Sequence, residues 1–424
     1  MSNLFFNHYL ILPVGTCTNL YKPCIVHQSS FLFLAMAQSI WITILVRITK
    51  PNYIMMLKEI CFCLLVFSFP QLINAQIAVP FDTANWDIKA QEYQLTDYQG
   101  KKALQLKNGT AYLETAGFKD GIIEWDMAFP NERGFTGVRF RIVDLSNMEE
   151  FYLRPHQSGK PDANQYCPVD NGLSSWQLYH GEAYSASYTY KFDEWFHVKL
   201  VVSGTRAEVY IDDMNTPVLH AFFLKRQPIA GGLMVYSGLV STYFSGFSYT
   251  PKDNPTLIGN PVAESEMDPL TIPVWSVSSP FPEKRLERAF SLKDIQVNDL
   301  AWQDLKVESS GTANLGTVAV LDGEKQNTVF AKAVINATED QLKALHFGYS
   351  DRAKVYCNGT AIYSGNNSYM TRDFRYLGTI GYFDTVYLPL NKGRNEIWIA
   401  VSESFGGWGL RGKLDDLDGV DLVY

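Results

Sequence analysis

From residue 78 to residue 249, short runs of alternating apolar and polar residues are separated by turn-forming residues. The runs are rich in β-branched and aromatic side chains, and no long stretch carries the 3.6-residue period of an amphipathic helix. This pattern predicts a sandwich of two antiparallel sheets over residues 76–250. The expected strands lie at residues 122–129, 137–143, 150–154, 175–179, 196–202 and 207–211.

Residues 286–424 show the same texture of strand and turn. The pair Asn358-Gly359 between two apolar runs is a strong hairpin signal. The pattern predicts a second β-sandwich, of the jelly-roll kind. Its expected strands lie at residues 328–335, 353–357, 360–363, 385–390 and 396–401, and one helical turn is expected at residues 339–344.

Between the two halves the composition changes. Seven prolines fall in residues 251–282, with acidic residues between them. Such a segment favours an extended backbone. We therefore expect residues 251–285 to link two all-β domains and to contribute one strand near residues 274–277.

An export signal is predicted inside the chain. Lys58 precedes an apolar run at residues 60–69, and the small-residue sequence Ile73-Asn74-Ala75 follows it. The run is shorter than the ~20 apolar residues that span a bilayer. Residues 55–75 are thus expected to be a signal peptide cleaved after Ala75, which makes the protein secreted or periplasmic and its membrane contact limited to export.

Residues 1–54 fit this interpretation poorly, because a second apolar stretch at residues 31–46 precedes the export signal. We interpret them as an upstream segment included by a start codon assigned too early. The alternative is a membrane anchor formed by residues 31–46, with Arg47 and Lys50 beside it.

Composition narrows the function. The formal net charge is −8 and no basic stripe is visible, so nucleic acid is not expected as a partner. Beyond residue 75 only Cys167 and Cys357 remain, one in each half, so neither half is a disulfide scaffold. No cofactor is indicated.

The ordered set Gly121–Asp126, Gly137–Arg141, Glu194–Lys199 and Ala207–Asp212 resembles the strands of the concanavalin A-like, laminin G-like sandwich. Within that fold it is similar to the group of 3-keto-disaccharide hydrolases. The resemblance covers about residues 81–249, and it implies a sugar-active or sugar-binding domain.

The second half resembles the galactose-binding-like jelly rolls of secreted carbohydrate-active proteins. The matching residues are Phe347–Asp351, Val355–Gly359, Leu388–Glu396 and Phe405–Gly409. The resemblance implies a binding or packing module. Aromatic and arginine residues of its loops are expected to dock on the first domain, and a ligand-binding rim beside Gly406 and Gly407 is the alternative. These residues are Tyr363, Tyr369, Arg372, Arg375, Tyr376 and Trp408.

Two carboxylates raise the question of catalysis. Glu124 and Asp126 are two apart in a predicted strand and therefore share a face. Laminarinase-type glucanases place another carboxylate three residues after the aspartate, where this chain has Phe129. Because a retaining mechanism needs two carboxyl groups ~5–5.5 Å apart, Glu124 and Asp126 are expected to be structural, and they remain weak catalytic candidates together with His156.

A polar and aromatic surface is the stronger candidate. Alternation places several forked donors, amides and rings on outward faces of neighbouring strands, the combination that sugar hydroxyls and C–H faces require. The alternative is that the arginines pair with Asp144, Glu149 or Glu150 and that Trp176 fills the core. The predicted ligand-binding set is Arg139, Arg141, Tyr152, Arg154, His156, Gln165, Trp176, Gln177 and Tyr179.

No metal set emerges, because the histidine spacings fit neither a helical pair nor a zinc knuckle. Structural calcium stays open through the loop carboxylates Asp212 and Asp213, or Asp415, Asp416 and Asp418.

Three functions remain open from the sequence. The first is a secreted, non-catalytic carbohydrate-binding protein or an auxiliary of glycan degradation. The second is a glycoside hydrolase of the 3-keto-disaccharide hydrolase type, and the third is an extracellular adhesion or structural module.

Overall fold

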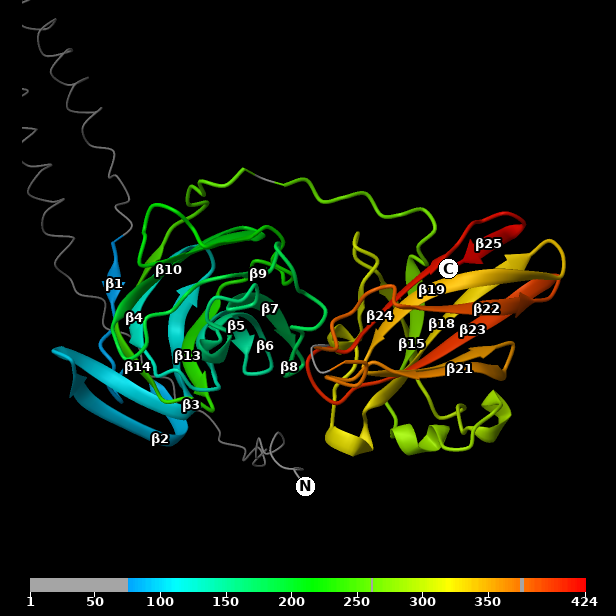
Figure 1. Cartoon of the computed structure of the whole chain (residues 1–424), viewed down its shortest axis with the longest axis horizontal. Helices are drawn as coiled ribbons and strands as arrows, with labels where there is room; N and C mark the ends of the chain where they lie inside the picture. Colours follow the sequence, from blue (N-terminus) through cyan, green and yellow to red (C-terminus); the bar gives the residue numbers. More distant parts are fainter. Residues whose placement is uncertain (1–74, 261, 374–376) are drawn as a thin grey trace, which may run out of the picture. The chain divides into compact units, whose positions relative to one another are not determined.

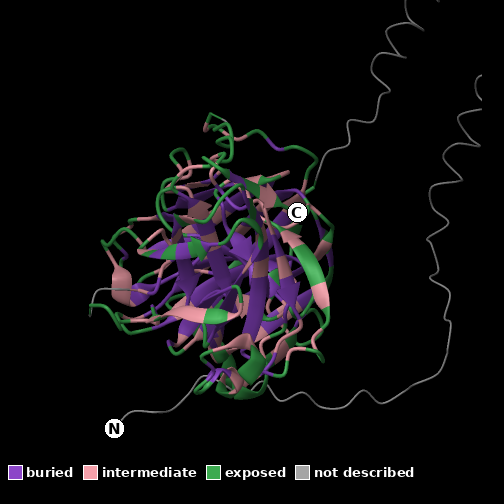
Figure 2. Cartoon of the chain, turned by 90° about the vertical axis from the view of Figure 1, so that its right-hand side faces the viewer, coloured by how far each residue is buried: buried purple, intermediate pink, exposed green. Residues whose placement is uncertain are grey.

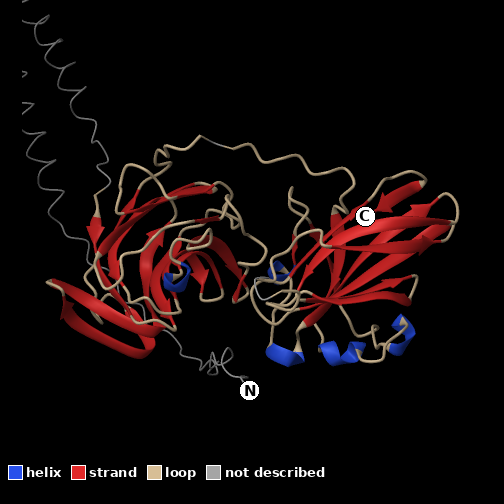
Figure 3. Cartoon of the chain, in the orientation of Figure 1, coloured by secondary structure: helices blue, strands red, loops and turns tan. Residues whose placement is uncertain are grey.

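Strands account for nearly all of the regular secondary structure (Figure 3). The computed structural model describes residues 75–260, 262–373 and 377–424. Helices within these residues are short 3-10 turns, and none of them is long and apolar enough to cross a membrane. The predicted all-β class is confirmed. The upstream segment 1–54 and all of the predicted signal peptide except Ala75 lie outside the described residues.

Fourteen strands form one continuous sheet over the first sandwich (Figure 1). Its order is β12-β11-β10-β4-β14-β3-β13-β5-β6-β7-β8, with β1 beside β14, β2 beside β3 and β9 beside β7. The strands are β1 (Ile77–Ala78), β2 (Asp87–Tyr98), β3 (Lys101–Phe118), β4 (Gly121–Ala128), β5 (Phe135–Asp144), β6 (Asn147–Leu153), β7 (Asn164–Asp170), β8 (Leu173–Ser174), β9 (Ser185–Ala186), β10 (Phe196–Ser203), β11 (Arg206–Ile211), β12 (Leu219–Ala221), β13 (Gly231–Gly238) and β14 (Thr242–Pro251).

The long strand β3 joins the two layers of this sandwich. Residues 104–106 pair with β14, whereas residues 109–118 pair with β13. The sheet therefore closes over a single core, in which Trp125 from β4 and Phe140 from β5 are both buried. Figure 2 shows buried residues concentrated on strands in the interior of the molecule. Alternation decides which side chains enter the core, as the alternating burial along β4 shows.

The second sandwich consists of two sheets. A seven-stranded sheet has the order β16-β15-β18-β23-β20-β21 with β25 beside β18, and a four-stranded sheet has the order β17-β24-β19-β22. Its strands are β15 (Val274–Ser278), β16 (Trp302–Lys306), β17 (Ala313–Asn314), β18 (Thr328–Ala337), β19 (Gln341–Ser350), β20 (Arg352–Cys357), β21 (Thr360–Asn366), β22 (Asp384–Leu390), β23 (Gly393–Ser402), β24 (Gly409–Leu414) and β25 (Val420–Val423).

Five 3-10 turns complete the described elements: η1 (Pro155–Gln157), η2 (Glu283–Leu286), η3 (Leu292–Asp294), η4 (Leu315–Thr317) and η5 (Gly323–Lys325). Trp275 and Trp408 are fully buried in the core between the two sheets of the second sandwich. Trp275 belongs to β15, so the proline-rich segment contributes a strand between β16 and β18 to this sandwich, as expected for residues 274–277.

Most of the predicted strands are confirmed, including β4, β5, β10 and the β20–β21 hairpin across Asn358 and Gly359. Two predicted elements are wrong. Residues 175–179 form a turn rather than a strand, with the N–H groups of Leu178 and Tyr179 both directed to the Ser175 carbonyl. The helical turn expected at residues 339–344 is absent there, because β19 begins at Gln341 and pairs with β22.

Candidate functional site

The candidate site lies on the outer face of the layer that contains β13, β5, β6 and β7. Along β5, Val138 and Phe140 are buried in the core, so Arg139 between them points outward. The strand register places Glu150 of β6 on one side of Arg139 and Met234 of β13 on the other.

A glycine lies between two tyrosines in the strand register next to Arg139. Gly137 lies opposite both Tyr152 of β6 and Tyr236 of β13. A Cβ atom on Gly137 would lie 2.2 Å from the carbonyl oxygen of Phe151, so glycine is required for this close approach of the strands.

Arg139 is fixed by an ion pair and a ring. Its Nε donates a hydrogen bond of 2.6 Å to Glu150 Oε2, and its guanidinium carbon lies 4.3 Å from the centre of the Tyr236 ring. The Arg139 side chain is 19% exposed, whereas that of Glu150 is 5% exposed. The guanidinium is therefore held in place while part of it stays accessible to solvent.

Arg154 organises the adjacent part of the face. Its Nη2 donates to the Tyr152 hydroxyl and to Gln165 Oε1, both at 2.7 Å, and its Nη1 donates to Asp162 Oδ2 at 2.7 Å. The guanidinium carbon lies 5.0 Å from the Tyr152 ring centre and 5.4 Å from that of Trp176. A buried arginine whose Nη1 and Nη2 groups are both hydrogen-bonded thus holds Tyr152 and Gln165 beside the half-buried indole of Trp176.

Gln165 positions the turn that carries Trp176. Its Nε2 donates to the carbonyl oxygens of Trp176, at 2.9 Å, and of Tyr179, at 2.6 Å. Burial raises the pKa of the Tyr152 phenol well above its ordinary value, so this hydroxyl stays neutral at physiological pH. The polar groups of the site are therefore held in fixed directions before any ligand binds.

His156 lies at the edge of the face, in the turn η1. Its ring centre is 5.5 Å from that of Phe135, whose ring is 6.2 Å from the Tyr152 ring. Burial and the nearby charges of Arg133 and Arg154 lower the pKa of His156 to about 4. The imidazole is neutral at pH 7, and its Nδ1 accepts a hydrogen bond of 3.4 Å from the Gly134 N–H.

Arg141 does not join the other predicted residues. Its backbone adopts φ of +51°, and the pairing of β5 with β6 shifts between Phe140 and Asp144. Such a bulge ends the strict two-residue alternation, so Arg141 turns away from the face of Arg139. Its guanidinium is buried and donates to Asp120 Oδ1, to the Lys119 carbonyl and to the Gly204 carbonyl, each at 2.7 Å.

Gln177 and Tyr179 also lie elsewhere, because residues 175–179 form a turn. Gln177 is fully buried and donates from Nε2 to the Leu377 carbonyl at 2.7 Å, and its backbone N–H donates to the Gly406 carbonyl at 2.8 Å. The Tyr179 hydroxyl donates to Glu308. Both residues therefore contact the second sandwich instead of lining the candidate site.

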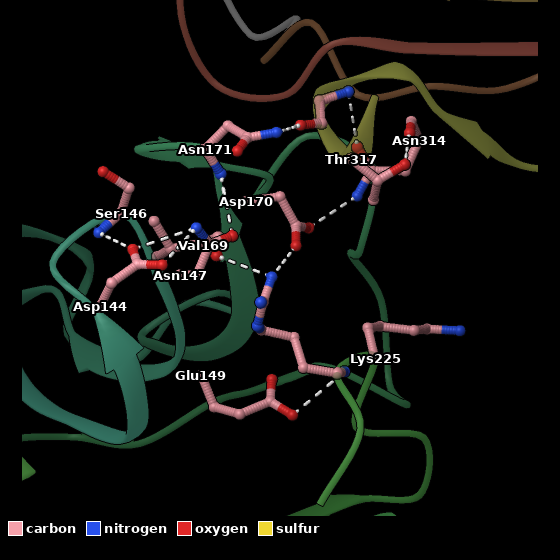
Figure 4. Close-up of polar contacts among 12 residues, drawn as sticks. Asp144, Ser146, Asn147, Glu149, Val169, Asp170, Asn171, Lys225, Asn314 and Thr317 are labelled. Carbon is pink, nitrogen blue, oxygen red and sulfur yellow. Dashed lines mark hydrogen bonds and ion pairs between the residues drawn. The ribbon is translucent and has the colours of Figure 1, made fainter. Parts of the chain in front are cut away.

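Other polar contacts strengthen the association of the two sandwiches (Figure 4). Asn314 Nδ2 donates to Asp170 Oδ2 at 3.0 Å, and Asn171 Nδ2 donates to the Gly316 carbonyl at 2.9 Å. Lys225 Nζ lies 2.6 Å from Glu308 Oε2. Leu178 adds an apolar contact, packing against Ile380.

Of the second-sandwich residues expected to dock, Trp408 is buried in its own core and Tyr363 packs on that core. Arg372 forms an ion pair with Asp384. Tyr369 lies 6.1 Å from Phe405, measured between ring centres. Arg375 and Tyr376 lie outside the described residues. On the second sandwich, the contacts described above come from other residues, such as Glu308 and Asn314, which the sequence did not predict to dock.

Glu124 and Asp126 share the outer face of the opposite layer, as predicted. His197 of β10 lies between them, with Nδ1 2.8 Å from Asp126 Oδ1 and Nε2 3.5 Å from Glu124 Oε1. Lys101 Nζ lies 2.6 Å from Asp126 Oδ2. The hydrogen bond from His197 lowers the pKa of Glu124. Burial raises the pKa of Asp126, but hydrogen bonds from His197 and Lys101 outweigh it and leave that pKa lowered.

The same contacts raise the pKa of His197 to about 9, chiefly through its hydrogen bonds to Asp126 and Glu124. A raised histidine pKa stabilises the fold fully below the unfolded value near 6.5, and this stabilisation is lost as the pH rises through 9. We expect the free energy of unfolding, measured with urea, to fall between pH 6.5 and 9 in the wild type and much less in His197→Gln. Identical pH profiles for the two proteins would contradict this assignment.

A hollow of about 710 Å³ opens near this cluster, beside β1 and β14. Its lining includes Gln76, whose Nε2 donates to Ser248 Oγ at 2.9 Å and to Glu124 Oε2 at 3.2 Å. None of the predicted ligand-binding residues lines it.

No group of three or more histidine, cysteine, aspartate or glutamate side chains is arranged to hold a metal within residues 75–260, 262–373 and 377–424. Of the loop carboxylates considered for calcium, Asp212 lies 3.4 Å from Lys191 Nζ, and Asp416 pairs with Lys343.

Three residues of the candidate site were missed as ligand-binding residues by the sequence: Phe135, Glu150 and Tyr236. Glu150 had been considered only as a partner for the arginines, and it does pair with Arg139. The run Leu233-Met234-Val235-Tyr236 could have predicted β13, with Leu233 and Val235 facing the core and Tyr236 facing outward. Cys167, buried on the same face, lies 3.2 Å from Ser174 Oγ through its sulfur.

The chain matches no known family model, and no curated protein matches it in sequence. Among solved structures, it is similar to the carbohydrate-binding module CBM66 from Bacillus subtilis, with 17% identity and a TM-score of 0.30 over 39% of this chain and 95% of that one. It is also similar to the β-glucanase of Bacillus licheniformis, with 12% identity and a TM-score of 0.30 over 42% of this chain and 98% of that one. Because these scores are low, the all-β class is established by the strands and sheets of the protein itself.

Proposed function

We propose that the protein is an exported, non-catalytic carbohydrate-binding protein that holds a glycan against Arg139, Arg154 and Trp176. The observation that carries this proposal is the half-buried Trp176 indole beside the hydrogen-bonded guanidinium of Arg154, 5.4 Å away. Sugars present hydroxyl groups that need directional partners and C–H faces that pack on aromatic rings. The site offers both kinds of group on one face of a sheet.

Fixed geometry supports binding at this position. Arg154, Tyr152 and Gln165 are hydrogen-bonded to one another, and Arg139 is paired with Glu150. A ligand that contacts these groups need not order them, so less conformational entropy is lost on binding. The partly exposed groups at the edge, Arg139, His156 and Trp176, are those that a ligand reaches first.

The state of Glu124 and Asp126 argues against bond cleavage by this pair. A glycosidase needs one carboxyl group that keeps its proton near neutral pH. Glu124 and Asp126 instead have lowered pKa values and are bridged by His197. They are better suited to holding charge pairs on the surface than to donating a proton to a leaving group.

A glycan array and a panel of immobilised polysaccharides test the proposal, using protein recovered after export, whose first residue is expected to be Gln76 by N-terminal sequencing. We expect binding without release of sugar, and Trp176→Ala is expected to weaken it at least tenfold, or about 1.4 kcal/mol. Trp195→Ala is the matched control, since that indole donates to the Tyr98 carbonyl on the opposite layer.

Three results would contradict the proposal in different ways. Release of reducing sugar would instead support the hydrolase. Capture of protein ligands that sugars do not displace would support the adhesion module. Unchanged glycan binding in Trp176→Ala would place the site elsewhere.

A further inference from the structure

The loop at residues 403–407 of the second sandwich lies against the turn that carries Trp176. The Gln177 N–H donates to the Gly406 carbonyl at 2.8 Å. Gly406 has φ of +102°, and a Cβ atom there would lie 2.3 Å from Gln177 Oε1 and 2.9 Å from Trp176 Nε1. Only glycine allows the loop to approach this closely.

This close contact places aromatic rings of the second sandwich beside Trp176 of the candidate site. The ring centre of Phe405 lies 6.3 Å from that of Trp176 and 6.1 Å from that of Tyr369. Phe405 is 43% exposed, so part of its ring is open to solvent beside the contact with the first sandwich. Three aromatic side chains thus follow one another across the two sandwiches.

Contacts inside the second sandwich hold the loop in place. The buried carboxylate of Asp351 accepts a hydrogen bond of 3.0 Å from the Ser404 N–H, and the Glu403 N–H donates to the Asn327 carbonyl at 2.8 Å. Arg352 Nη1 donates to Ser404 Oγ at 3.0 Å. Phe405 therefore extends from an anchored loop. Little conformational entropy of this loop is lost when a ligand binds to it.

We propose that the second sandwich completes the carbohydrate site, with Phe405 and Tyr369 extending the aromatic surface that begins at Trp176. The ligand is then a chain of several sugars that lies across both sandwiches. This inference rests on the proposed function, because Trp176 belongs to both surfaces. A sugar chain suits this surface better than an apolar partner does, because the aromatic rings lie next to the hydrogen-bonding groups around Arg154.

Isothermal titration with matched probes of two lengths tests the inference: the hexasaccharides and disaccharides of cellulose, xylan, laminarin, mannan and arabinan. Phe405→Ala is expected to weaken binding of the preferred hexasaccharide about tenfold and to leave the matching disaccharide unchanged. Trp176→Ala is expected to weaken both.

Gly406→Ala tests the loop without removing a ring, and it is expected to weaken the hexasaccharide more than the disaccharide. Gly393→Ala is its control, because Gly393 also has a positive φ, of +94°, but no atom lies within 4 Å of its Cβ position. Thermal unfolding of each variant confirms that the fold is retained.

The outcomes separate the inference from the function on which it rests. If Phe405→Ala changes neither probe, or changes both equally, the extended site is overturned while the site at Trp176 stands. If no sugar binds and a protein ligand requires Phe405, the surface is a protein contact and both proposals fail. If no probe binds at all, both proposals fail as well.

Discussion

Replacing Arg141 by methionine is expected to lower the free energy of unfolding by about 3–5 kcal/mol, because it leaves the carboxylate of Asp120 buried without its partner. The Arg141 side chain is 1% exposed, and its guanidinium also satisfies the carbonyl groups of Lys119 and Gly204. Urea denaturation at pH 7 measures the change. Glycan binding by the folded fraction is expected to be unchanged, since Arg141 lies away from the candidate site.

Two further variants make this measurement specific. Arg133→Met removes an exposed loop arginine and is expected to change stability by no more than ~0.5 kcal/mol. Adding Asp120→Asn to Arg141→Met is expected to restore part of the loss, because the carboxylate is then no longer buried as an unpaired charge. A loss below ~1 kcal/mol in Arg141→Met would show that the buried pair is dispensable.

Introducing a charge at Leu178 is expected to uncouple the two sandwiches. Leu178 is 2% exposed and packs against Ile380, and a Cβ atom on Gly409 would lie 2.3 Å from its Cδ2. Truncating such a leucine costs about 2–5 kcal/mol, and the carboxylate in Leu178→Asp would be buried in addition. Calorimetry is expected to show one unfolding transition in the wild type and two in this variant.

Leu342→Asp is the control for this experiment. Leu342 is 70% exposed in β19, so a charge there should leave a single transition near the wild-type temperature. A single transition in Leu178→Asp, shifted only in temperature, would mean that contacts such as Asp170 with Asn314 are sufficient to keep the sandwiches together.

Alternation predicted the sheets and part of the site. It placed Arg139, Tyr152 and Arg154 outward. Arg154 does lie beside the rings of Tyr152 and Trp176, and Arg139 lies over the Tyr236 ring of the same face. It failed at Arg141, because a residue with positive φ breaks the two-residue period without changing the type of residues in the run.

The prediction of a strand at residues 175–179 was wrong for a different reason. The alternating apolar and polar residues there are typical of a strand, yet β9 rather than this segment pairs with β7 at Gln165. The Gln165 side chain instead donates to the Trp176 and Tyr179 carbonyls of the turn. A contact made by a residue ten or more positions away decides the local structure. The same holds for the partners of Asp170 and Tyr179 in the second sandwich, since no local pattern connects residues so far apart.

The two cysteines of residues 75–424 lie one in each sandwich, and both are buried as free thiols. Burial raises the pKa of Cys357 to about 11 and that of Cys167 well above its ordinary value, so neither forms the reactive thiolate while its sandwich stays closed. Each thiol is therefore a natural reporter of the opening of its own sandwich. The rates at which a thiol reagent labels the two sulfurs would give the opening rates of the two sandwiches separately, without an engineered cysteine.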